Sequence, residues 1–178
     1  NLPTSYADPN GNEFVVVSGT RRVTTAGGKT FSECECNPEE MEAIKSSVRE
    51  MCNKVPNIVT SVNEDLGKCI SGFCEIGVIT CMRRKPGQTP ETKWPTLGDN
   101  ATENPADNAI RPLRGGESIN LYIDTINEKG WNYGATAIHE WGHGCNCWGG
   151  SDEHEDYEEG GRCGMLPWAG IRRHEPWF

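Results

Sequence analysis

Cysteine content constrains this chain more than any other feature, because nine of its 178 residues are cysteines. Such a density is typical of proteins that fold in an oxidising compartment and carry several disulfides. The cysteines are Cys34, Cys36, Cys52, Cys69, Cys74, Cys81, Cys145, Cys147 and Cys163. An odd number leaves at least one thiol that is unpaired, bonded to another chain or bound to a metal. We therefore expect a secreted protein, extracellular or periplasmic, with disulfide-stapled loops.

A structural zinc site is the alternative use of these cysteines. One residue separates Cys34 from Cys36, and one separates Cys145 from Cys147. Structural zinc sites usually space their paired cysteines by about two to four residues. The spacing therefore favours disulfides, and we expect Cys145, Cys147 and Cys163 to fix the loop around residue 150.

Length and charge limit the class of protein. A chain of 178 residues suggests one domain. The formal net charge of −9 argues against a nucleic-acid partner, which would require clustered Lys and Arg. No apolar run approaches the roughly 20 residues of a membrane-spanning helix. The chain starts at Asn1 without an apolar signal segment, so we expect a processed chain or an excised fragment.

Hydrophobic periodicity predicts an α+β fold. Short apolar runs predict strands at residues 14–17, 22–25, 75–82 and 118–123. Apolar residues at helical spacing predict helices at 38–55, 58–66 and 133–144, with Pro56 ending the first of them. Residues 85–117 show little periodicity and are expected to form a long loop. Together these elements predict a mixed sheet of about three to five short strands, packed against helices.

The last of these helices carries the motif HExxH, formed by His139, Glu140 and His143. Residues four apart lie on the same side of a helix, so both imidazoles can reach one ion. Glu140 lies beside them and can polarise a water without binding the metal itself. Zinc lowers the pKa of a bound water to about 7, and a carboxylate can take its proton as the water attacks a carbonyl. The motif therefore predicts a zinc-dependent hydrolase with Glu140 as the general base.

The motif and its setting resemble the zincin metallopeptidases. That resemblance implies a small mixed sheet with the HExxH helix beneath its edge. It also implies that the strand at 118–123 binds extended substrate by strand addition. Residues 13–178 would form this peptidase domain, and residues 1–12 an N-terminal segment or linker. We expect Trp141, like the later tryptophans, to pack around the metal site or to line substrate pockets.

The third metal ligand distinguishes two zincin groups. His154 and Glu155 resemble the third ligand and acidic neighbour of the metzincins, although the pattern HExxHxxGxxH places Gly149 at the ligand position. The sequence around Met165 also resembles the Cys-x-Met-x-Pro turn of their adamalysin branch. Asp156 and Tyr157 resemble a stretched version of the aspzincin pattern, in which the third ligand is Asp. His154 and Asp156 therefore stay open as alternatives, and a Cys ligand is a less common third choice.

Residues 1–11 resemble the segment that ends the conserved part of Rhs/YD-repeat proteins, with its Asp-Pro-x-Gly turn at Asp8. Variable toxin domains follow that segment in such proteins. The resemblance implies a bacterial effector that is delivered to a target cell and matched by an immunity or inhibitor protein. A plain polar turn is the alternative interpretation of the same residues.

The function predicted from the sequence is zinc-dependent hydrolysis of peptide bonds in a protein or peptide substrate. Two other classes compete with it. One is a metal-dependent amidase that acts on cell-wall peptide. The other is a disulfide-rich binding module in which HExxH occurs by accident, and metal analysis separates that class from both hydrolases.

Overall fold

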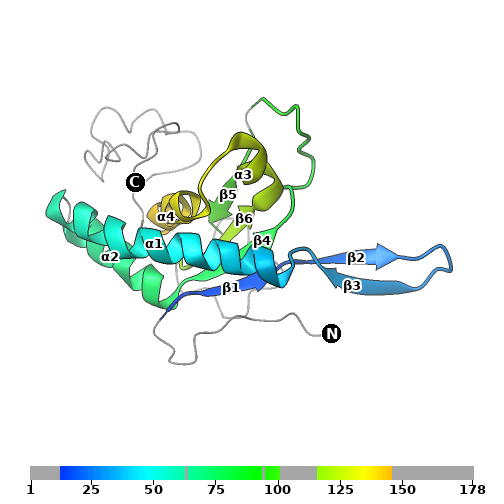
Figure 1. The fold of residues 1–178 in the computed structure, drawn as a ribbon, viewed down its shortest axis with the longest axis horizontal. Coiled ribbons are helices and arrows are strands. Elements are labelled where there is room, and N and C mark those ends of the chain that lie inside the picture. The colour runs from blue at the N-terminus through cyan, green and yellow to red at the C-terminus, as the bar shows by residue number, and fades with distance from the viewer. Residues whose placement is uncertain (1–12, 63, 94, 101–115, 146–178) are drawn as a thin grey trace.

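The main sheet of this protein has four strands in the order β1-β4-β6-β5. The computed structural model describes residues 13–62, 64–93, 95–100 and 116–145. Strands β1, β4 and β6 are parallel, and β5 pairs antiparallel with β6 at one edge (Figure 1). Their bounds are Val15–Ser18 for β1, Val78–Met82 for β4, Gly98–Asn100 for β5 and Ser118–Tyr122 for β6. The expected mixed sheet of short strands is therefore confirmed.

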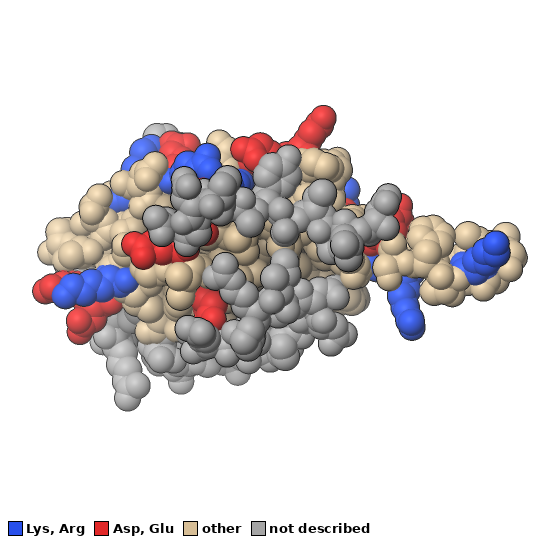
Figure 2. Space-filling view, turned by 90° about the horizontal axis from the view of Figure 1, so that it is seen from below, with Lys and Arg blue, Asp and Glu red and all other residues tan. Residues whose placement is uncertain are grey.

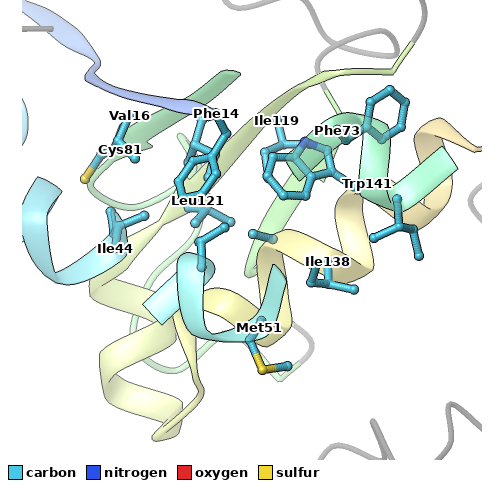
Figure 3. Close-up of a cluster of buried hydrophobic side chains, with 14 of the residues drawn as sticks. Phe14, Val16, Ile44, Met51, Phe73, Cys81, Ile119, Leu121, Ile138 and Trp141 are labelled. Carbon is cyan, nitrogen blue, oxygen red and sulfur yellow. The ribbon is translucent and has the colours of Figure 1, made fainter. Parts of the chain in front are cut away.

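Helices α1 (Pro38–Val62) and α4 (Tyr133–Gly144) pack on one face of this sheet, α2 (Glu64–Ile76) packs against these two helices, and a short helix, α3 (Ile123–Lys129), follows β6. Successive strand residues point to opposite faces, so Ile79, Ile119 and Leu121 all point toward α1 and α4. Figure 3 shows Ile119 and Leu121 meeting Ile44, Met51 and Ile138 of the helices in one core, to which Ile79 also belongs. None of the helices in the described residues is long and apolar enough to cross a lipid bilayer.

Helix α1 begins as expected but does not end where Pro56 predicts. The Asn37 side chain accepts a hydrogen bond from the Glu40 amide, and the Glu40 carboxylate accepts one from the Asn37 amide, which completes a capping box. The helix then continues through Pro56 to Val62. Its buried stripe extends past the proline to Val59. Packing of that stripe outweighs the lost hydrogen bond, so the predicted break and the separate helix at 58–66 are wrong.

Several further elements differ from the sequence prediction: β1 and β2 have other bounds than the predicted 14–17 and 22–25, and β3 and α3 were not predicted. Residues 75 and 76 belong to α2, so β4 starts later than predicted. The predicted strand at 118–123 ends at Tyr122, because Ile123 begins α3. The predicted long loop contains β5, which has three residues and no apolar alternation to reveal it.

Three disulfides cross-link the described residues, as the cysteine content predicts. They join Cys36 to Cys81, Cys52 to Cys74 and Cys69 to Cys145. Cys34 is exposed and unpaired, whereas Cys147 and Cys163 lie outside the described residues. Six cysteines therefore form disulfides rather than the alternative Cys-ligated zinc site.

Strands β2 (Thr20–Thr24) and β3 (Thr30–Cys34) form an antiparallel hairpin that projects from the body of the molecule. We call it the arm, and Figures 1 and 2 both show it extending away from the packed helices and sheet. Most of its side chains are exposed, including Phe31. At its base, the Gly19 amide donates to the Cys81 carbonyl and the Glu35 amide donates to the Gly19 carbonyl. The arm is thus anchored to β4 at one end only.

Candidate metal centre

Helix α4 is positioned at its first turn by a contact with α1. Asn132 caps the helix, since its side-chain oxygen accepts from the Ala135 amide. The Ser47 hydroxyl donates to that same oxygen and accepts from the Gly134 amide. Gly134 also has no room for a side chain, because a Cβ there would lie 2.4 Å from the Ser47 carbonyl oxygen. The start of α4 therefore has a fixed position on α1.

The apolar side of α4 faces the core, so its other side carries the motif. Ala137, Ile138 and Trp141 are fully buried. Trp141 packs edge-on against Phe14 and donates its indole hydrogen to the Glu117 carbonyl. Trp141 therefore forms part of the core, and the alternative expectation that it lines a substrate pocket is wrong.

His139 and His143 meet on the opposite side of the helix. Their Nε2 atoms lie 3.3 Å apart, and their ring centroids are separated by 5.0 Å with the planes at 77°. Both residues are partly buried. Zinc binds imidazole nitrogen at about 2.0–2.1 Å, so two nitrogens on one tetrahedral ion lie about 3.3–3.4 Å apart. The separation of the two nitrogens and the chemistry of these donors therefore fit one zinc ion.

Glu140, the residue after His139, packs against the edge strand of the sheet. The residue is buried, and its side chain packs against Gly98 of β5. A Cβ on Gly98 would lie 2.9 Å from Glu140 Cγ and 3.2 Å from Glu140 Oε1. The carboxylate that the motif assigns as the general base thus lies beside β5.

Strand β6 is paired on both sides, by β4 and β5, so the strand-addition site expected at 118–123 is wrong.

A buried polar cluster holds β5 from the other face of the sheet. Asp99 accepts hydrogen bonds from the Asn120 amide group and the Tyr122 hydroxyl, both at 2.7 Å. Lys85 Nζ lies 3.5 Å from the same carboxylate. Burial and the hydrogen bond to Asp99 raise the pKa of Tyr122 well above its usual range. The phenol therefore stays protonated and continues to donate to Asp99.

The end of α4 is cross-linked to α2. Cys145 is the C-cap of the helix, two residues after His143, and its disulfide partner Cys69 lies on α2. The Cys145 amide also donates to the Trp141 carbonyl. The expectation that Cys145 forms a disulfide is thus confirmed, and the loop around residue 150 that it was expected to fix lies outside the described residues.

The proposed third ligands, His154 and Asp156, lie outside the described residues, as do Glu155, Tyr157 and Met165. Within the part of the chain that the structure describes, no group of three or more His, Cys, Asp or Glu residues could hold a metal. The described part of the site therefore consists of the two imidazoles, and Glu140 is linked to them by its position in the motif.

Sequence reasoning missed two residues that shape this site, Gly98 and Asn100 of β5. Both contact Glu140, although each lies in a stretch without periodicity.

Comparison of the chain with protein-family models, curated proteins and solved structures finds no significant match. The interpretation of the site therefore depends on its geometry.

Proposed function

We propose that this protein is a zinc-dependent endopeptidase with a zincin-like arrangement. The observation that carries the proposal is the 3.3 Å separation of the His139 and His143 Nε2 atoms, and Glu140 is the residue that follows His139 in the motif. The position of α4 next to β5 and β6 supports the expected placement of the metal helix beneath the sheet edge. In this proposal His139 and His143 hold the zinc, and His154 or Asp156 completes its protein ligands.

The roles of the chain's own residues follow from this placement. A bound zinc would supply Lewis acidity to the attacking water and the scissile carbonyl. Glu140 would take the proton of the water as it attacks, which is the role that the HExxH motif assigns to its carboxylate. The protonated Glu140 would then give that proton to the leaving amine. Its contact with Gly98 and its burial would hold the carboxylate in one place during both transfers.

A direct hydrogen bond between the two imidazoles is the competing explanation of their distance, since 3.3 Å also permits one. Metal analysis of the full chain decides between them. We expect one zinc per molecule in the wild-type chain and none in His143→Ala. His174→Ala is the matched control, because it removes a histidine that the proposal does not use. Absence of zinc from the wild-type chain after incubation with the ion would refute the metal centre.

Activity then tests the role of Glu140. We expect Glu140→Gln to retain zinc and lose casein hydrolysis by at least about 100-fold, as for removal of a general base. Normal turnover in that variant would contradict the mechanism. Parallel assays on purified cell wall separate the endopeptidase from the amidase. Zinc analysis of His154→Ala and Asp156→Ala then identifies the third ligand.

We further propose that the enzyme acts in an oxidising compartment as a bacterial effector. The three disulfides fit folding in an extracellular or periplasmic environment. The effector role, with its immunity protein, depends on the resemblance of residues 1–11, which lie outside the described residues. Periplasmic and cytosolic expression in a bacterium test both ideas. Toxicity should appear in the periplasm and disappear with Glu140→Gln.

A further inference from the structure

Asn100, the last residue of β5, forms hydrogen bonds with two separate parts of the site. Its side chain is buried, and its Nδ2 donates to the backbone carbonyls of Glu140 and Gly116, each at 3.0 Å. A primary amide has two hydrogens, and this geometry uses both of them. A single side chain thus ties the sheet edge to the turn before β6 and to the residue proposed as the general base.

Gly98 provides a second contact between β5 and Glu140. Gly98 and Asn100 are two apart on one strand, so they face the same side, toward α4. The Glu140 side chain occupies the space that a Gly98 side chain would need. Strand β5 therefore contacts Glu140 at two points. Asn100 contacts the Glu140 backbone, and Gly98 contacts the Glu140 side chain.

Close backbone contact keeps α4 from shifting along this strand. A Cβ on Gly144 would lie 2.4 Å from the Gly116 carbonyl oxygen and 2.9 Å from Asn100 Nδ2. Gly116 has a φ of 101°, a conformation that favours glycine. The end of α4, the Gly116 turn and the Asn100 amide therefore fit together without spare room.

We propose that Asn100 is a positioning residue that sets the place of the Glu140 carboxylate relative to His139 and His143. This inference rests on the proposed peptidase function. A carbonyl inside a helix already accepts a hydrogen bond from the amide four residues later. The Glu140 carbonyl therefore accepts the bond from Asn100 as a second hydrogen bond, beyond the one that the helix supplies. This second bond aligns β5 with residue 140. Gly98 then leaves the space that the aligned carboxylate occupies.

The test compares Asn100→Ala with Asn120→Ala in the full, zinc-loaded chain. Asn120 is a matched control: it is equally buried, lies on the neighbouring strand and donates to Asp99 on the opposite face of the sheet. With fluorescently labelled casein as the probe, we expect Asn100→Ala to lower kcat by about 10- to 100-fold, as misplacement of a catalytic group does. KM and the zinc affinity measured by chelator competition should stay within about twofold, because the His pair is intact. Asn120→Ala should lower the Tm but leave kcat within about twofold, because Tyr122 still donates to Asp99 and keeps β5 in place.

Three results overturn the inference: an unchanged kcat in Asn100→Ala, an equal loss of kcat in Asn120→Ala, or a loss of zinc affinity that accounts for the effect. If Asn100→Ala does not fold, Asn100→Leu takes its place, since leucine keeps the size of the side chain but donates no hydrogen bond to the Glu140 carbonyl. A wild-type chain that binds no zinc and cleaves no casein refutes the proposed function, and this inference with it. A wild-type chain that cleaves casein, beside an equally active Asn100→Ala, refutes the role of Asn100 alone.

Discussion

Helix α4 and the arm show two different ways of holding a segment in place. Helix α4 is fixed at its start by Ser47, at its middle by the core and by Asn100, and at its end by the disulfide to Cys69. Its partners come from α1, α2 and the sheet. The arm is held by pairing between its own two strands and by its base, with its side chains largely in solvent. Figure 1 shows this contrast between a packed helix and a projecting hairpin.

The contrast predicts a large difference in how the two regions respond to mutation. Burial and long-range cross-links contribute several kcal/mol each, whereas exposed cross-strand pairs contribute roughly 0.2–1 kcal/mol. Two-stranded hairpins are marginally stable by themselves. Changes in α4 should therefore alter both global stability and the proposed metal centre, and changes in the arm should alter neither by much.

The largest expected effect follows removal of the Cys69–Cys145 disulfide by the double substitution Cys69→Ser and Cys145→Ser. This bond joins residues 76 apart in sequence, and loop entropy gives up to about 4.5 kcal/mol of stability for that separation. The bond also holds the residue two positions after His143. We expect lower stability in urea unfolding and weaker zinc binding in chelator competition.

The control for this change is the double substitution Cys52→Ser and Cys74→Ser, which removes a disulfide between α1 and α2. Its residues are 22 apart, for which loop entropy gives up to about 3.4 kcal/mol. The control should reduce stability but leave zinc affinity unchanged. Equal losses of zinc affinity in the two variants would show that the Cys69–Cys145 bond has no special relation to the site.

A second comparison sets Ile138 of α4 against Phe31 of the arm. Ile138 is fully buried beside His139, so Ile138→Ala should cost about 3 kcal/mol in urea unfolding. Phe31 is 48% exposed, and Phe31→Ala should cost less than about 1 kcal/mol. A similar cost for both would mean that the arm is packed against something other than its own strands.

The same contrast explains what the sequence could predict. Helix α4 was predicted with its observed bounds, because Asn132 and the buried positions Ile138 and Trp141 are local signals of cap and period. The mixed sheet and the disulfide cross-linking also follow from patterns within short segments or from composition. His139, Glu140 and His143 could be named as a group because their spacing alone brings them to one side of a helix.

What the sequence could not predict depends on contacts between distant segments. Strand β5 has three residues, and its place beside α4 follows from Asn100 reaching Glu140, 40 residues away. Helix α1 passes through Pro56 because its buried stripe continues against α2 and α4, which no local rule includes. Nine cysteines can pair in many ways, and the pairing of Cys69 with Cys145 depends on the fold, which brings these two residues together.

A smaller effect is expected for the ion pair between Glu13 and Arg49, which lies in the body of the protein. Glu13 accepts two hydrogen bonds from Arg49, and Lys45 Nζ lies 3.6 Å away, so the pKa of Glu13 lies below its ordinary value of 4.5. A carboxylate with a lowered pKa stabilises the fold at pH values above its ordinary pKa. This contribution is lost as the pH falls through the lowered pKa of the folded state. We expect Glu13→Gln to cost about 1 kcal/mol at neutral pH. The difference from wild type should shrink in urea unfolding below pH 4.5, and a constant difference would contradict it.

The smallest effect is expected for the corresponding pair on the arm. Arg21 and Glu33 face each other across β2 and β3 with an Nη2 to Oε2 distance of 3.0 Å, and their side chains are 58% and 47% exposed. Solvent screens such a pair, so a double-mutant cycle with Arg21→Ala and Glu33→Ala should give a coupling of at most about 0.5 kcal/mol. That coupling should fall further in high salt, while zinc binding stays unchanged in all three variants. A coupling well above about 1 kcal/mol would place this pair in a drier environment than the arm has, and the contrast with α4 would then fail.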